Sequence, residues 1–208
     1  MKRRIQIAFM LALVSILCVS NINAEIIWDS GHHVFSEGSE TYLTMLNDAS
    51  ADMTGGWVAE FSMYNETSLE VFGGTISQLL CQDISTATIY DNNYMDLLRP
   101  NDSSTANVYG GTINYIFALG YSITNIYGGF FDEIAAEDFS SVNLYVESYD
   151  WDPTGGARYG GLITGVWLES NESFNIDLVS EGTINHLNFV PEPATILLFG
   201  MGGLILRI

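Results

Sequence analysis

Basic residues are scarce in this chain. Its 208 residues include 6 Lys and Arg against 25 Asp and Glu, which gives a formal net charge of −19 at pH 7. Four of the six basic residues lie close to the two ends, so only Arg99 and Arg158 remain between them. A nucleic-acid backbone needs a basic surface, so we exclude nucleic acid as a partner. An acidic surface favours solubility and attracts divalent cations.

Cysteine is also scarce. The chain has 2 Cys, and Cys18 lies in an apolar N-terminal run that we expect to be removed. Cys81 then has no partner for an internal disulfide. We expect it to fill a core position rather than to act as a nucleophile.

Common catalytic motifs are missing as well. No Gly-x-Ser-x-Gly, His-Glu-x-x-His, Walker, dinucleotide or Cys-x-x-Cys pattern occurs. Adjacent carboxylates such as Asp132 and Glu133 could serve a glycosidase. Polysaccharide-cleaving β-helices commonly add Lys or Arg, however, and here only Arg99 and Arg158 are available. We therefore expect a protein without enzymatic activity or cofactor, and a polysaccharide-cleaving enzyme is the weakest alternative.

Two segments carry potential metal ligands. Asp29, His32 and His33 form one set, but adjacent side chains on a strand point to opposite faces and do not easily share one ion. Asp150 and Asp152 are spaced as in a calcium loop, but a third acidic ligand at loop spacing is missing. We therefore predict an acidic turn there, and no metal site in the chain.

The dominant feature of the sequence is an internal repeat. The stretch STANVYGG at residues 104–111 returns as SITNIYGG at residues 122–129. The apolar residue before each aromatic recurs at intervals of 18, 18, 19, 18 and 18 residues, which gives the anchor series Met53, Val71, Ile89, Val108, Ile126 and Leu144. This period is too short for a propeller blade or a helical repeat. It predicts an all-β fold, a parallel β-solenoid (β-helix) with coils of about 18 residues.

Each coil is predicted to have two corners. The first, six residues before each anchor, holds residues that tolerate left-handed backbone: Asn47, Asn65, Asp83, Asp102, Gly120 and Asp138. The second follows the anchor strand and is a glycine pair at residues 55–56, 73–74, 110–111 and 128–129, with Asp91 and Asn92 as a substitute in one coil.

Period-2 alternation assigns the inward positions. These are the anchors and the residues two before them: Ala51, Leu69, Ala87, Ala106, Thr124 and Val142. Inward positions recur five residues beyond the anchors, at Val58, Ile76, Tyr94, Ile113, Phe131 and Tyr149, and eight beyond, at Phe61, Leu79, Leu97, Ile116 and Ile134. These positions together predict three short sides to each coil.

The repeat also sets the expected boundaries. Residues 25–52 are predicted to form an N-terminal cap and first coil, with one strand at residues 28–35, and residues 53–152 the repeats. Residues 153–189 are predicted to add short closing strands at 165–169, 173–178 and 184–189, with His186 on the surface or at an edge.

One outward column stands out as a candidate binding face. It lies one residue beyond the anchors and contains Phe72, Tyr90, Tyr109, Tyr127 and Tyr145, while the column one before the anchors contains Asn107 and Asn125. Stacked rings beside amides are suited to hold sugar rings. Aromatic and Asn ladders also stabilise solenoids without any ligand. The ladder is the simpler interpretation, and both remain open at this point.

The two ends of the chain indicate export. Residues 1–24 have a basic start, an apolar stretch and a small residue at Ala24 that suits cleavage, as in a secretory signal peptide. Signal peptidase and the general secretion machinery are the expected partners.

Residues 190–208 hold Pro191, Glu192 and Pro193, then an apolar run, then Arg207 near the extreme C-terminus. This arrangement resembles the PEP-CTERM family of bacterial surface proteins. The resemblance implies a C-terminal hydrophobic sorting helix that holds the protein transiently in the inner membrane. Exosortase would then cut near Pro191–Pro193 and release the protein to the cell envelope, the extracellular surface or exopolysaccharide.

Two functions are therefore expected from the sequence. The preferred one is an exported, non-catalytic cell-envelope or matrix protein sorted by exosortase. The alternative is a module that binds extracellular carbohydrate, or with less support ice, through Tyr90, Tyr109, Tyr127, Tyr145, Asn107 and Asn125.

Overall fold

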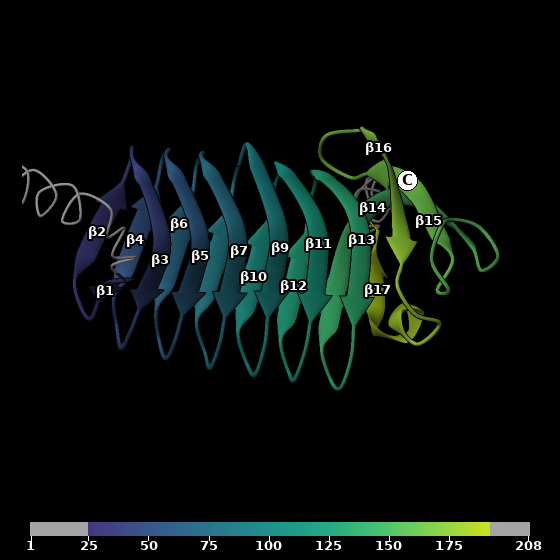
Figure 1. The fold of residues 1–208 in the computed structure, drawn as a ribbon. Coiled ribbons are helices and arrows are strands. Elements are labelled where there is room, and N and C mark those ends of the chain that lie inside the picture. The colour runs from purple at the N-terminus through teal and green to yellow at the C-terminus, as the bar shows by residue number, and fades with distance from the viewer. Residues whose placement is uncertain (1–24, 192–208) are drawn as a thin grey trace, which may run out of the picture.

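The structure is a computed structural model that describes residues 25–191, and it is an all-β solenoid (Figure 1). Six successive coils each contribute one four-residue and one seven-residue strand. The short strands are β2 (His32–Phe35), β4 (Ser50–Met53), β6 (Ser68–Val71), β8 (Thr86–Ile89), β10 (Thr105–Val108) and β12 (Ile123–Ile126). The long strands are β3 (Ser39–Met45), β5 (Trp57–Met63), β7 (Thr75–Cys81), β9 (Tyr94–Pro100), β11 (Thr112–Ala118) and β13 (Phe130–Ala136).

Five further strands and one short helix complete the described fold. They are β1 (Glu25–Trp28), β14 (Ser141–Asp152), β15 (Leu162–Trp167), β16 (Ser173–Leu178), the 3-10 helix η1 (Thr183–His186) and β17 (Leu187–Val190). The predicted β-solenoid with coils of about 18 residues is therefore confirmed.

The coils stack in parallel and in register, as the anchor series predicts. Val108 of β10 pairs with Ile89 of β8 on one side and with Ile126 of β12 on the other. All six anchors are fully buried. The residues two before them are buried as well, so the inward face of the short strands is confirmed. Cys81 belongs to the same core, where burial raises its pKa to about 12 and keeps the thiol protonated.

The first corner has the predicted backbone. Asn47, Asn65, Asp83, Asp102, Gly120 and Asp138 all have φ between 54° and 64°. This is the left-handed region, which Asn, Asp and Gly enter at the least cost. The repeated Asx or Gly position therefore sets where each coil turns.

The second corner differs from the prediction in one coil. Glycine adopts positive φ in five of the six coils, at Gly56, Gly74, Gly111 and Gly129 as predicted and also at Gly38, but neither Asp91 nor Asn92 does so. This coil has one extra residue, and the buried Asn92 side chain replaces the glycine turn. It accepts a hydrogen bond from the Thr112 backbone N–H (2.9 Å) and donates one to the Thr112 carbonyl (3.2 Å). In other coils a glycine carbonyl accepts the corresponding hydrogen bond from the next coil, as Gly56 does from Thr75. The Asn92 side chain takes over that role here.

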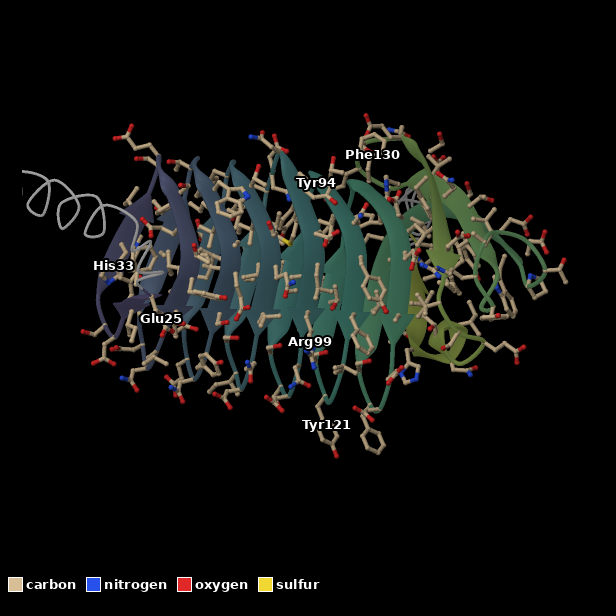
Figure 2. The ribbon with its side chains drawn as sticks, viewed as in Figure 1. Glu25, His33, Tyr94, Arg99, Tyr121 and Phe130 are labelled. Carbon is tan, nitrogen blue, oxygen red and sulfur yellow. The ribbon has the colours of Figure 1, made fainter. Side chains whose placement is uncertain are left out.

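The extra residue also corrects two inward assignments. Tyr94 is exposed (Figure 2). Leu97 is half-buried, whereas Met95 and Leu98 are fully buried. The insertion lies between the anchor Ile89 and strand β9. It shifts the strand by one residue and so exchanges its two faces.

A third inward assignment is wrong for a different reason. Tyr149 is exposed because β14 continues beyond the stack and pairs antiparallel with β15. The chain was expected to turn inward here and complete another coil. Instead, β14 continues away from the stack to Asp152.

Each coil has two strands rather than the three sides that the sequence predicts. Val58 and Phe61 are both buried although they are three residues apart in the single strand β5. Strict alternation would place them on opposite faces. A bend within the long strand therefore provides the turn that we assigned to a corner between two separate sides.

The ends of the stack extend its two sheets. The expected strand at residues 28–35 is broken at Gly31 (φ 81°), so β1 pairs with β3 and β2 pairs with β4. At the other end β16 lies parallel to β13, β17 lies parallel to β14, and β15 is antiparallel between β14 and β16. The closing strands thus continue the ladders. His186 ends η1, where it is half-buried and its Nδ1 lies 3.0 Å from the Ser140 carbonyl oxygen.

Candidate functional site

The predicted aromatic column exists as one continuous stack. Each of its first four rings directly follows the last residue of a short strand, and Tyr145 lies within β14. The ring centroids are 4.9 Å apart for Phe72 and Tyr90, 5.4 Å for Tyr90 and Tyr109, 4.5 Å for Tyr109 and Tyr127, and 4.1 Å for Tyr127 and Tyr145. Neighbouring planes differ by 5–17°. The in-register parallel strands impose this spacing.

The stack determines which parts of the rings are accessible. The inner rings contact a neighbour on both faces, so they offer mainly their edges and hydroxyl groups to solvent. Phe72, Tyr90 and Tyr109 remain 45%, 43% and 42% exposed, and Tyr127 and Tyr145 are half-buried. A sugar therefore cannot pack face-on against the inner rings, and at the C-terminal end of the stack Val190 of β17 pairs with Tyr145. Each ring pair contributes about 0.5–1.5 kcal/mol beyond its buried area, which is a structural contribution.

The amide column is a hydrogen-bonded ladder. Asn125 Nδ2 donates to Asn107 Oδ1 (2.9 Å), and Asn143 Nδ2 donates to Asn125 Oδ1 (2.8 Å). Asn188 of β17 continues the ladder by donating to Asn143 Oδ1 (2.9 Å). The repeat could not predict Asn188, because it lies 45 residues after Asn143 and outside the 18-residue period. Asn125 keeps one amide hydrogen and one oxygen lone pair outside the ladder, whereas Asn143 Oδ1 also accepts from the Ser141 hydroxyl (3.5 Å).

The phenol groups of the column interact with one another. Hydrogen bonding to the Tyr145 hydroxyl, followed by burial, raises the pKa of Tyr127 above its ordinary value. The Tyr127 phenol is therefore neutral at physiological pH. Uncharged rings stack without mutual repulsion, which suits a long ladder.

The residues weighed as metal ligands have other partners. His32 lies 3.1 Å from Ser50 Oγ and 3.5 Å from Asp52 Oδ2. His33 stacks on Trp28 at 4.6 Å. Asp152 Oδ1 accepts hydrogen bonds from the backbone N–H and the hydroxyl of Thr154, both at 2.9 Å, which closes a turn. Within residues 25–191, no three His, Cys, Asp or Glu side chains gather as a metal site.

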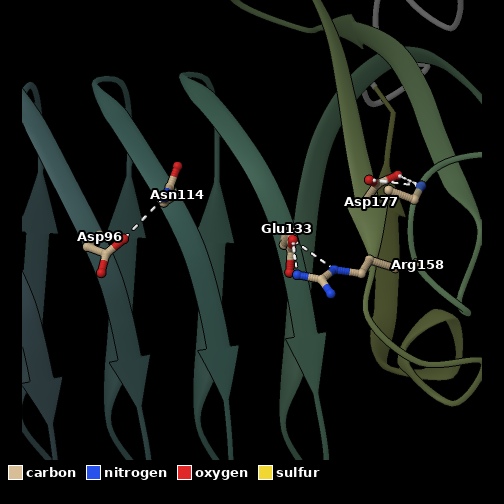
Figure 3. A network of polar contacts seen from close by, with 6 residues as sticks. Asp96, Asn114, Glu133, Arg158 and Asp177 are labelled. Carbon is tan, nitrogen blue, oxygen red and sulfur yellow. Dashed lines mark hydrogen bonds and ion pairs between the residues drawn. The ribbon is translucent and has the colours of Figure 1, made fainter.

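A shallow cleft lies where the loop after β14 meets the long strands, and Figure 3 shows the polar contacts beside it. Its volume is about 380 Å³, and it is lined by Asn114, Tyr115, Asp132, Glu133, Arg158 and Val179. Arg158 Nε donates to Glu133 Oε1 (2.8 Å). Asn114 Nδ2 donates to Asp96 Oδ1 (3.1 Å) on the neighbouring coil.

The cleft was only partly visible in the sequence. The sequence indicates Asp132 and Glu133 only as adjacent carboxylates, and Arg158 only as one of few basic residues. Arg158 and Glu133 are 25 residues apart, so no repeat spacing connects them. Their ion pair and the hydrogen bonds from the Ala157 N–H to the Asp177 carboxylate hold this loop against the sheet. The polar side chains of the cleft therefore serve to attach the loop to the solenoid.

The sorting residues lie almost entirely outside the described structure. Only Pro191 is described, and it is exposed directly after β17. Ala24, Glu192, Pro193 and Arg207 lie outside the described residues, as do the signal peptide and the expected C-terminal helix. No helix within residues 25–191 is long and apolar enough to cross a membrane.

The geometry thus consists of an aromatic ladder, an amide ladder and an acidic cleft closed by one arginine, all on a stacked solenoid. None of these features alone assigns the chain to a family. Comparisons with protein-family models, with curated proteins and with solved structures yield no match.

Proposed function

We propose that this chain is an exported, non-catalytic protein of the cell envelope or extracellular matrix, sorted by exosortase through Pro191, Glu192 and Pro193. The observation that carries the proposal is where the last strand ends. β17 ends at Val190, and Pro191 follows it outside any strand. The expected exosortase motif therefore begins directly after the last hydrogen-bonded strand of the solenoid.

The last strand supports this division. Val190 pairs with Tyr145 as the final position of the sheet formed by the short strands. Pro191 has no N–H to continue that ladder, and it is exposed. Cleavage near this point would leave every described strand intact. Residues before the cut would form the displayed domain, and those after it would serve for membrane retention before processing.

The partners follow from this order of events. Signal peptidase and the general secretion machinery would export the chain. The apolar C-terminal run would hold it in the inner membrane until exosortase acts. The acidic solenoid would then be displayed at the cell surface or within exopolysaccharide.

We expect processing to depend on the proline residues. Replacing Pro191 and Pro193 by Ala should leave an unprocessed form in the membrane fraction, because the sorting signal is lost while the fold is kept. Immunoblotting of membrane and released fractions from an exosortase-containing host measures this. The double variant Ser103→Ala and Ser148→Ala, at two exposed positions far from the tail in sequence, serves as the matched control. Normal release of the proline variant would contradict the family assignment.

Carbohydrate binding is the second candidate, because the ladders keep exposed ring edges and unused amide groups. An extended neutral polysaccharide lying across Tyr109, Tyr127 and Asn125 would use both. A pull-down with neutral and acidic exopolysaccharides, with and without calcium, compares the parent with the variant Tyr109→Ala and Tyr127→Ala. We expect the neutral polymer to retain the parent protein and not to retain the variant. Equal retention of both proteins, or of neither, leaves the rings as a structural ladder.

A further inference from the structure

The tyrosines of the aromatic stack are arranged for covalent coupling. All 11 tyrosines of the chain lie within residues 25–191. Three stacked pairs join one tyrosine to another, namely Tyr90 with Tyr109, Tyr109 with Tyr127, and Tyr127 with Tyr145. The other stacked tyrosines have phenylalanine partners: Tyr115, Tyr121 and Tyr149.

We propose that this column is a site of oxidative modification, in which a one-electron oxidant joins stacked tyrosines of neighbouring coils into dityrosine. The two closest pairs, Tyr109 with Tyr127 and Tyr127 with Tyr145, are the expected positions. This inference does not depend on exosortase sorting or on carbohydrate binding.

The backbone places the coupling atoms close together. The N–H of Tyr127 donates to the Val108 carbonyl and the N–H of Tyr109 donates to the Ile89 carbonyl, both at 2.8 Å. The two tyrosines therefore occupy equivalent positions on neighbouring coils. Their planes differ by 5° with centroids 4.5 Å apart. Equivalent carbons of two nearly parallel stacked rings lie at about the same separation, so the ortho carbons are close to each other. The rings must then turn out of face-to-face stacking, because the new carbon–carbon bond lies in the plane of both rings.

The reaction balances with a peroxide as oxidant. Each phenol loses one electron and one proton and becomes a phenoxyl radical. The two radicals form one carbon–carbon bond between ring positions ortho to their oxygens. The hydrogens on those two carbons then move to the oxygens, which restores both phenols. The two electrons and two protons removed reduce one hydrogen peroxide to two waters through a peroxidase, so the protein loses two hydrogen atoms.

Charge favours coupling within one molecule over coupling between molecules. The chain carries a formal net charge of −19, so two copies repel each other at low ionic strength. The most exposed tyrosine, Tyr159, is 88% exposed and has no stacked tyrosine. Without a neighbour in position, its radical must meet a second molecule.

The experiment uses the full chain as it is purified, treated with a peroxidase and hydrogen peroxide at low ionic strength. The monomer is isolated by size exclusion, and dityrosine is measured by its blue fluorescence and by the loss of two hydrogen atoms in the intact mass. Peptide mapping then identifies the joined residues. We expect a cross-linked monomer with Tyr127 joined to Tyr109 or to Tyr145, and a melting temperature above that of the untreated protein.

A matched pair of variants tests the geometry. The variant Tyr109→Phe and Tyr145→Phe keeps every ring but leaves no two tyrosines adjacent in the column. The control Tyr121→Phe and Tyr159→Phe removes as many tyrosines outside the column. We expect several-fold less intramolecular dityrosine in the first variant and the parental yield in the control, with circular dichroism verifying both folds.

Two results would overturn the proposal. One is an equal intramolecular yield in the two variants. The other is a peptide map of the parent that shows only intermolecular links or links outside the column. Since the map reads the joined residues directly, it decides the question even if a variant folds poorly.

Discussion

Replacing Val108 by Asp is expected to abolish the fold. Val108 is fully buried and is paired in register with Ile89 and Ile126, so a carboxylate there would lie inside the stack with no hydrogen-bonding partner. An unpaired buried charge costs several kcal/mol, a large share of a typical folding free energy of about 5–15 kcal/mol. We expect loss of the β-type circular dichroism signal and of cooperative melting.

The matched control for this change is Thr105→Asp in the same strand. Thr105 is only half-buried and lies on the opposite face of β10, so a carboxylate there stays in contact with water. We expect this variant to melt cooperatively within a few degrees of the parent. A Val108→Asp protein that melted like the Thr105→Asp protein would show that the assignment of inward and outward faces is inverted.

Replacing Gly111 by Ala is expected to have the second-largest effect. Gly111 has φ of +90°, and an added Cβ would collide with the Asn92 side-chain oxygen, 1.8 Å away. Asn92 would have to move and give up its two hydrogen bonds to Thr112. Left-handed strain costs about 1–3 kcal/mol, and leaving a buried polar group unsatisfied costs about 1–3 kcal/mol more. Chemical denaturation should therefore show a loss of about 2–6 kcal/mol.

Two other glycines separate these contributions. Gly38→Ala introduces the same kind of strain, since φ is +96°, but its Cβ meets nothing within 4 Å. It should cost only the strain term, about 1–3 kcal/mol. Gly182 has φ of −70° and room for a Cβ, so Gly182→Ala should be nearly neutral. Equal losses for Gly111→Ala and Gly38→Ala would mean that the Asn92 contacts contribute no measurable stability.

The ladders explain why this solenoid tolerates a strongly acidic surface. Stacked neutral rings and linked amides run along one face, so neighbouring coils attract each other there through groups that carry no charge. The Glu133 carboxylate is paired with Arg158. The remaining acids can stay solvated and keep separate molecules apart.

The sequence by itself determined the repeat, the inward face of the short strands and the position of the first corner. These depend on local rules that act in every coil: alternation along a strand, and the preference of Asn, Asp and Gly for left-handed backbone. Because each pattern occurs in several coils, one irregular coil does not prevent its recognition. The aromatic and amide columns followed in the same way, because in-register stacking turns a repeated residue into a ladder.

Only the tertiary structure decided where the period breaks and what the columns present to solvent. One inserted residue before β9 shifted the strand by a position, so Met95 instead of Tyr94 faces the core. Arg158 and Asn188 contact Glu133 and Asn143 because the last loop and the last strand pack back against the stack. These contacts do not follow the 18-residue spacing, so the repeat does not predict them. Ring separation and orientation likewise depend on the packing of neighbouring coils. The sequence therefore identified which residues share a face, and the packing decided that their rings stack against one another.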